Sequence, residues 1–186
     1  MTTGRAGRLI SINSSNGGVP KQPVPAAKVT RLGLEQDRHV DRNHGGPERA
    51  ICIYPIELIQ ALRDEGHPIS AGTAGENFTV QDLDWSLIAP GVTLSVGNAV
   101  RLEVTSFTSP CKTIVGSFAD GRFSRISQKL HPGWSRVYAR VLDEGGVRVG
   151  DPVTIANHPS GSRLEQAPPI GDTWHGEGGL GCRKRI

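Results

Sequence analysis

The chain has 186 residues, of which 24 are glycine and 13 are proline, and its net charge is only +3. This length suits one domain, or one domain with a tail, and buries enough surface for a core without disulfide bonds. The chain lacks the dense Lys/Arg runs of a nucleic-acid-binding arm, and aromatic residues that could stack on bases make up only 5% of it. No stretch approaches the ~20 consecutive apolar residues that a membrane span needs.

The cysteines and the N-terminus suggest a location. Three cysteines, at positions 52, 111 and 182, are widely spaced and cannot all pair. The first residues, MTTGRAGRLISINSS, lack the apolar segment of a signal peptide. We therefore expect reduced thiols and a cytoplasmic protein.

Hydrophobic alternation predicts a mostly β body with few helices. Apolar runs or alternations bounded by Gly and Pro indicate strands near residues 9–12, 29–32, 50–54, 92–96, 100–104, 137–141, 147–149 and 153–155. Gly97-Asn98 is expected to form a hairpin turn, and Gly145-Gly146 a turn into the strand at 147–149. Short strands at this spacing predict a closed or nearly closed β-barrel.

A helix is expected at residues 56–65, and short turns of helix are expected at residues 82–88 and 111–119. Residues 157–186 contain six Gly and three Pro without apolar periodicity, so we interpret them as a tail that packs locally or stays disordered. The folded domain is expected to span residues 8–156.

Three polar, Gly-containing segments each follow an expected strand, where functional loops often lie on a rigid scaffold. They are residues 33–39 with 43–49, residues 75–79, and residues 108–112. The first lies in the quarter of the chain that carries the positive excess, with Arg31, Arg38, Arg42 and Arg49. In it, Gly45 and Gly46 would let backbone N–H groups approach an anion that arginines grip. A structural turn on a solvated basic face is the alternative.

In the second segment, Asn77 is a candidate donor, and Glu76 is expected to accept bonds from the backbone or from an arginine, with a catalytic role as the alternative. In the third, Pro110 and Lys112 flank Cys111, and a helix that begins there would also favour the thiolate. A thiolate at position 111 could act as a nucleophile, a persulfide carrier or a soft metal ligand. The alternative interpretation is that Cys111 is an inert, buried cysteine. Cys52, in an apolar run, is expected in the core. The His and Cys spacings do not fit a zinc site.

These segments, in this order, resemble the MOSC domain family, named after the C-terminal domain of molybdenum cofactor sulfurase, and most of all its small stand-alone bacterial members. The matching stretches are GLEQDRH (33–39), HGGPERAICIYP (44–55), AGENFTV (74–80), SVGNAVRLEV (95–104), SPCK (109–112) and YARVLDEGGVRVGD (138–151). The resemblance covers roughly residues 8–156. One departure is Gln36, where the family usually has Gly.

The resemblance implies a barrel like the one in pyruvate kinase, a pterin-based molybdenum cofactor, and Cys111 as the thiolate ligand of molybdenum. It also implies a set of residues that hold the cofactor: Arg38, His39, His44, Gly45, Gly46, Arg49, Asn77, Thr108, Ser109 and Lys112.

The leading hypothesis is an oxo-transfer oxidoreductase that reduces N-hydroxylated small molecules. No iron–sulfur spacing or flavin motif is visible, so electrons would come from a separate reductase. The second hypothesis is a sulfur carrier that holds a persulfide on Cys111, loaded by a partner cysteine desulfurase; pyridoxal phosphate would belong to that partner and not to this chain. The third is a non-catalytic module that binds a phosphorylated ligand. A nucleic-acid or membrane partner is not expected, and the sequence leaves the oligomeric state open.

Overall fold

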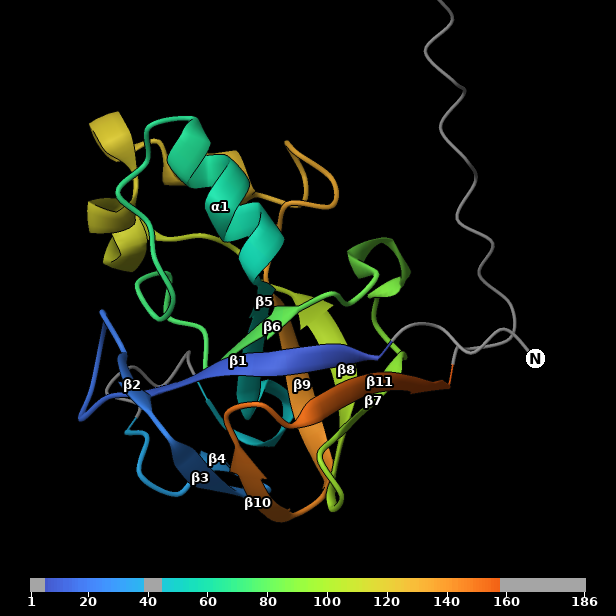
Figure 1. Ribbon diagram of the computed structural model, residues 1–186. Coiled ribbons are helices and arrows are strands. Elements are labelled where there is room, and N and C mark those ends of the chain that lie inside the picture. Colours follow the sequence, from blue (N-terminus) through green and yellow to red (C-terminus); the bar gives the residue numbers. More distant parts are fainter. Residues whose placement is uncertain (1–5, 39–44, 158–186) are drawn as a thin grey trace, which may run out of the picture.

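The computed structural model describes residues 6–38 and 45–157 (Figure 1). His39, His44 and residues 158–186 of the expected tail lie outside them. The strands are β1 (Gly7–Ser14), β2 (Gln22–Val24), β3 (Ala26–Thr30), β4 (Gly33–Leu34), β5 (Ile51–Pro55), β6 (Phe78–Gln81), β7 (Thr93–Val96), β8 (Val100–Phe107), β9 (Val137–Asp143), β10 (Gly145–Arg148) and β11 (Pro152–Asn157). The helices are α1 (Ile56–Asp64) and the 3-10 segments η1 (Pro47–Arg49), η2 (Trp85–Leu87), η3 (Lys112–Ser117), η4 (Ala119–Gly121) and η5 (Phe123–Ile126).

The main sheet closes into a barrel. Its strands follow the order β11-β7-β8-β9-β5-β6-β1, with β2 paired to β1, and β11 pairs back onto β1. The closing pair is antiparallel and aligns Gly7 with Val153 and Arg8 with Pro152. All neighbours are antiparallel except β5 and β6, which run parallel because α1 connects them. The predicted mostly β closed barrel is confirmed.

Alternation along the strands explains the barrel interior. In β9, Val137, Ala139 and Val141 are buried, while the residues between them are partly exposed. In β7 and β8 the same pattern buries Leu94 and Leu102, which face each other in the register. These side chains join one apolar cluster that fills the barrel. The expected hairpin between β7 and β8 is present, with Gly97 at a φ of 60° in its turn.

A second, three-stranded sheet, β10-β3-β4, lies at one end of the barrel (Figure 1). It corrects the expected turn at Gly145-Gly146, because both glycines are strand residues paired with Val29 and Lys28. The expected strand at 29–32 ends at Thr30, and the chain then turns into β4. The pairing of β10 with β3 joins residues more than a hundred positions apart, so local alternation could not reveal it.

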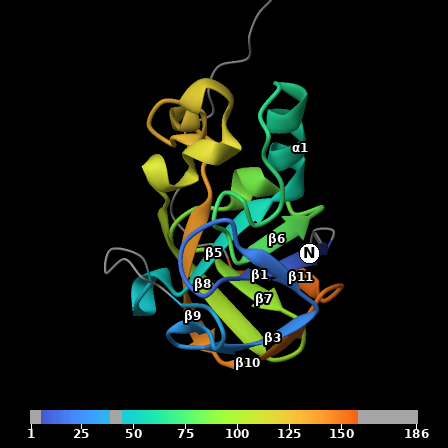
Figure 2. The ribbon, with the colours of Figure 1, turned by 90° about the vertical axis from the view of Figure 1, so that its left-hand side faces the viewer.

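A helical layer covers the opposite end of the barrel, where α1 stands beside η3, η4 and η5 (Figure 2). Ile59 and Leu62 of α1 pack with Ile114, Phe118 and Ile126 into a second apolar cluster. The helix expected at 56–65 is confirmed as α1, and the short helical turns expected at 82–88 and 111–119 are present as the 3-10 segments η2 and η3. No helix among the described residues is long and apolar enough to cross a membrane.

Candidate functional site

Three neighbouring strands present polar side chains on the face that points away from the barrel interior. In β5, Ile51 and Ile53 belong to the interior cluster, so Cys52 between them faces outward. Cys52 pairs in register with Tyr138 of β9. On its other side Asn77, just before β6, donates its backbone N–H to the Cys52 carbonyl at 2.8 Å. This outer face forms the floor of the site.

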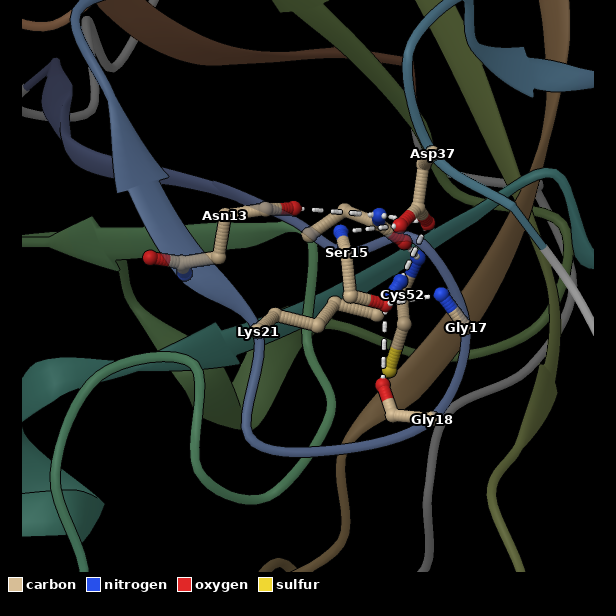
Figure 3. Close-up of polar contacts among 8 residues, drawn as sticks. Asn13, Ser15, Gly17, Gly18, Lys21, Asp37 and Cys52 are labelled. Carbon is tan, nitrogen blue, oxygen red and sulfur yellow. Dashed lines mark hydrogen bonds and ion pairs between the residues drawn. The ribbon is translucent and has the colours of Figure 1, made fainter.

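The Asn77 amide connects the floor to the loops above it. Its Oδ1 accepts the backbone N–H of Cys52 at 3.0 Å, and its Nδ2 donates to Asp37 Oδ2 at 2.8 Å. Asp37 also accepts the backbone N–H of Ser15 at 2.8 Å and forms a buried ion pair with Lys21. Figure 3 shows Ser15 and Lys21 converging on Asp37 next to Cys52. Residues distant in sequence are thereby held in one polar network.

Arg136 and Glu76 are buried beside this network. Glu76 Oε1 accepts the Gly72 backbone N–H at 2.6 Å and the Thr79 hydroxyl at 3.1 Å, which confirms its expected structural role. Burial raises the pKa of Glu76, and the nearby Arg136 opposes that shift. Arg136 Nη1 donates to the carbonyl of Ala74, while Arg136 Nε and Glu76 Oε2 have no hydrogen-bond partner.

The basic loops form the rim. The backbone N–H of Arg38 donates to the Ser15 carbonyl at 2.9 Å, which fixes the loop after β4 against the loop after β1. Gln36 is not among the residues with positive φ, so it fits where the MOSC pattern has Gly. Gly45 and Gly46 have φ values of 90° and 79°, as expected for the turn into η1. The Arg49 guanidinium lies 5.7 Å from the centre of the Tyr138 ring.

Cys111 lies at the end of the extended segment after β8 and is the N-cap residue of η3. It is a free cysteine with a partly exposed side chain, and its thiol donates to the Thr113 hydroxyl at 3.3 Å. The alternative interpretation, in which Cys111 is a fully buried cysteine, is therefore wrong.

Rim and floor enclose one cavity of about 330 Å³. Its described lining contains two sulfur atoms, from Cys52 and Cys111, and four charged side chains, all cationic: Lys21, Arg38, Arg49 and Arg136. The hydroxyl-bearing and small residues of the lining are Ser15, Gly18, Gly45, Ala74, Gly75, Thr113 and Tyr138. A cavity with this charge favours anionic ligands, and its thiols offer soft metal ligands.

The structure brings only some of the sequence-predicted residues to this cavity. Cys111, Arg38, Gly45, Arg49 and Asn77 line it. Gly46 and Lys112 are exposed and are not among its lining residues. His39 and His44 lie outside the described residues.

Thr108 and Ser109 instead line a separate, more open depression beside η5. Thr108 also holds Arg136 in place, because its backbone N–H donates to the Arg136 carbonyl at 2.9 Å and its own carbonyl accepts the Ser135 hydroxyl at 3.0 Å.

Sequence reasoning missed several lining residues, among them Lys21, Arg136, Tyr138 and Cys52. Lys21 and Arg136 are charged residues outside the three polar segments, and nothing local marks them as buried. The alternation of Val137 and Ala139 does indicate that Tyr138, between them, faces away from the core. Cys52 was assigned to the core, and it is 3% exposed, but it also contacts the cavity.

Burial sets the protonation of the floor. Burial raises the pKa of Cys52 from 9.0 to about 11, against the lowering effect of Arg136. It likewise raises the pKa of Tyr138 to about 12. At neutral pH the floor therefore presents a neutral thiol and a neutral phenol next to guanidinium groups.

The MOSC domain model matches residues 40–154, more than half of the chain, so the chain belongs to the MOSC domain family. It is 32% identical over 136 residues to the uncharacterized protein YflK of Bacillus subtilis, covering 72% of this chain and 60% of YflK. It is 28% identical over 153 residues to protein YiiM of Escherichia coli, covering 79% of this chain and 66% of that protein.

A protein of Gibberella moniliformis named "Reductase" is 28% identical over 132 residues, which are 68% of this chain and 23% of that protein. The chain thus spans less than two thirds of the length of these curated relatives. Among solved structures, YiiM from Geobacillus stearothermophilus superposes with a TM-score of 0.63 at 25% identity, covering 81% of this chain and 75% of that one.

The chemistry of the cavity fits the molybdenum cofactor associated with this family. The accessible thiol of Cys111 is a soft ligand, and the cationic lining suits a phosphate group. The unpartnered Nε of Arg136 is a buried donor that an anionic ligand would satisfy.

Proposed function

We propose that this protein binds a pterin-based molybdenum cofactor in the cavity and is an oxo-transfer oxidoreductase that reduces N-hydroxylated compounds. The observation that carries the proposal is the accessible Cys111 thiol on the same cavity as the guanidinium groups of Arg38, Arg49 and Arg136. Membership of the MOSC family and a relative named "Reductase" support it.

Each residue has a role in this proposal. Cys111 Sγ is the protein's ligand to the metal, and Arg38 and Arg49 at the rim hold anionic groups of the cofactor. The positive φ of Gly45 lets the backbone approach the ligand closely. When bound, the cofactor supplies the two-electron oxo-transfer chemistry, while the protein orients it. His39 and His44 remain proposed contacts, whereas Thr108, Ser109 and Lys112 do not line the cavity and are assigned no contact. We also propose a cytoplasmic location, because both described cysteines are free thiols.

A separate reductase is the proposed electron donor, so the test supplies electrons chemically. The full chain is produced in a host that makes the cofactor and is assayed with a reduced viologen dye and an N-hydroxylated amidine. Two electrons and two protons convert the N–OH group into N–H and water. We expect dye oxidation that depends on the amidine and disappears in Cys111→Ala, with Cys182→Ala as the matched control. No turnover by cofactor-loaded wild-type protein contradicts the proposal.

The accessible thiol also supports a second candidate, the sulfur carrier. A partner cysteine desulfurase would transfer its persulfide sulfur to the Cys111 thiolate, and the desulfurase thiolate would be released. Intact mass after incubation with such an enzyme and cysteine tests this candidate. One added sulfur atom on wild-type protein but not on Cys111→Ala, together with no N-hydroxy reduction, favours the carrier. If wild-type protein shows neither N-hydroxy reduction nor sulfur uptake, and Cys111→Ser binds the phosphorylated ligand as well as wild type does, the non-catalytic binding module is favoured.

A further inference from the structure

Arg136 is a buried cation whose hydrogen-bonding capacity is only partly used. Arg136 is only 6% exposed to solvent, and it lines the floor of the cavity. Nη1 donates to the carbonyl of Ala74, but Nε has no hydrogen-bond partner. A buried guanidinium donor without an acceptor costs free energy, so a ligand that supplies an acceptor there gains affinity.

The carboxylates near Arg136 have other partners. Asp37 is engaged by Lys21, by the Ser15 backbone N–H and by the Asn77 amide. Glu76 is completely buried, and its Oε1 accepts the Gly72 backbone N–H and the Thr79 hydroxyl. No ion pair is formed by Arg136 with a described carboxylate. The floor therefore holds a buried guanidinium that no described carboxylate pairs with, and electrostatic attraction of an anion to it is strong because little solvent is present.

The chain also keeps space open beside this guanidinium. Gly75 lines the cavity with a φ of 85°, and a Cβ there would lie 3.7 Å from Arg136 Nη1 and 2.9 Å from Val19 Cγ1. A side chain at this position would be strained and would narrow the approach to Arg136. Lys21 also lines the cavity, and it has three ammonium protons, of which the described pair with Asp37 uses one.

We propose that the floor is an oxyanion subsite in which Arg136 Nε, assisted by Lys21 Nζ, binds a phosphate monoester or carboxylate group of a ligand whose other end faces Cys111. The subsite shares the cavity with the proposed function, but it rests on Arg136 and not on a metal. Two sources carry this chemistry: the phosphate of the cofactor and a carboxylate of the substrate.

The test uses the full chain produced in a host that cannot make the cofactor, titrated calorimetrically with inorganic phosphate. We expect saturable binding at one site and at least a tenfold loss of affinity, about 1.4 kcal/mol, in Arg136→Gln. Arg101→Gln is the control, because it removes the same charge from an exposed arginine of β8 outside the cavity lining. Binding that does not saturate, or equal affinity in Arg136→Gln and wild type, overturns the proposal.

Arg136 also bonds to Ala74, so the folding of Arg136→Gln is checked by circular dichroism. If that variant does not fold, Arg136→Lys replaces it, which keeps the charge but lacks Nε. Weaker phosphate binding by Arg136→Lys than by Arg101→Lys supports the subsite, and equal binding overturns it.

Repeating the titration with cofactor-loaded protein separates the two sources. Loss of phosphate binding on loading identifies the cofactor's phosphate as the occupant. Retained binding that an N-hydroxylated carboxylic acid displaces, but its methyl ester does not, identifies the substrate. A chain that never takes up molybdenum can still bind phosphate through Arg136, so failure of the proposed function and failure of the subsite are distinguishable.

Discussion

Cys52 and Cys111 share one cavity but differ in environment. Cys111 is partly exposed at the rim, next to the Thr113 hydroxyl. Cys52 is buried at the floor, between Tyr138 and Asn77, and burial raises its pKa to about 11. The two sulfur atoms therefore have different roles: Cys111 is available to a ligand, whereas Cys52 remains a neutral thiol that packs against the site.

This difference predicts a loss of stability in alkaline solution. The folded protein keeps the Cys52 proton up to about pH 11, whereas the unfolded chain releases it near 9.0. The unfolded state then binds fewer protons, so the free energy of unfolding falls as pH rises through this window. The difference between the two pKa values corresponds to a loss of roughly 2–3 kcal/mol in the free energy of unfolding. Urea unfolding at pH values below and above 9 measures the fall.

Cys52→Ala is the matched variant for this measurement. Tyr54 and Tyr138 also have raised pKa values, so part of the alkaline loss will remain in the variant. We expect the variant to be less stable than wild type at neutral pH but to lose less stability above pH 9. Equal slopes for the two proteins would contradict a buried, protonated Cys52.

At the level of single residues, the sequence predicted best where chemistry and local pattern coincide. Cys111, Arg38 and Arg49 lie in polar, Gly- or Pro-flanked segments, and all three line the cavity. Arg136 and Lys21 could not be found this way, because charged residues are exposed by default and their burial depends on distant partners. Lys21 is buried by pairing with Asp37, sixteen residues away, and Arg136 by a carbonyl at position 74.

Among the elements, one arginine adds polar contacts between η5 and the end of α1 to the apolar cluster that packs them together. Arg125 of η5 makes two hydrogen bonds to Glu65, at 2.8 and 2.6 Å, just after α1. Its guanidinium also lies 3.6 Å from the centre of the Trp134 ring, and the Trp134 carbonyl accepts the Tyr54 hydroxyl at 2.9 Å. One side chain thus connects η5, α1 and the segment that leads into β9.

We expect Arg125→Ala to lower the free energy of unfolding by about 1–2 kcal/mol, because it removes a two-bond ion pair and a cation–π contact. Arg125 lowers the pKa of Glu65, so this contribution is present above the ordinary value of 4.5 and is lost as pH falls below it. Chemical unfolding at neutral and acidic pH measures the difference.

Arg122→Ala is the control, since Arg122 is exposed and its pair with Asp120 is long, at 3.7 Å. It should change stability by less than about 0.5 kcal/mol. Similar losses in Arg122→Ala and Arg125→Ala would argue against a specific tie between η5 and α1.

Strands with clear alternation, such as β7, β8 and β9, were predictable, and so was α1 with its apolar stripe. The short turns η2 and η3 were also expected, whereas η5 was not predicted. β2 and β4 have only three and two residues, too few for a periodic signal. The pairing of β10 with β3 was not predictable, because a register between distant strands has no local signature.

For the whole molecule, barrel closure depends on a close approach at Gly7 of β1. A Cβ built there would lie 2.6 Å from the Gln81 carbonyl oxygen and 3.1 Å from Leu83 Cβ. Gly7 also forms part of the closing pair with β11, opposite Val153. A side chain at this position would push β1 away from the backbone of β6 and would disturb the pairing of β1 with β11, which closes the barrel.

We therefore expect Gly7→Ala to destabilise the protein by about 1–3 kcal/mol, as overpacking does elsewhere. Gly146→Ala is the matched control, because Gly146 is an exposed strand residue with no atom within 4 Å of its Cβ position. It should change stability by no more than about 0.5 kcal/mol. Thermal unfolding of both variants measures these changes in stability. If Gly7→Ala is as stable as wild type, the barrel tolerates a wider spacing between β1 and β6.

The most direct test of the proposed cofactor ligand is the molybdenum and pterin content of the full chain, purified from a molybdenum-replete host that makes the cofactor. We expect about one molybdenum and one pterin per wild-type chain, the same content in Cys182→Ser, and loss of the metal in Cys111→Ser, since a hydroxyl is a poor soft ligand. Wild-type protein without metal, or Cys111→Ser with undiminished metal, would contradict the assignment of Cys111 as the ligand.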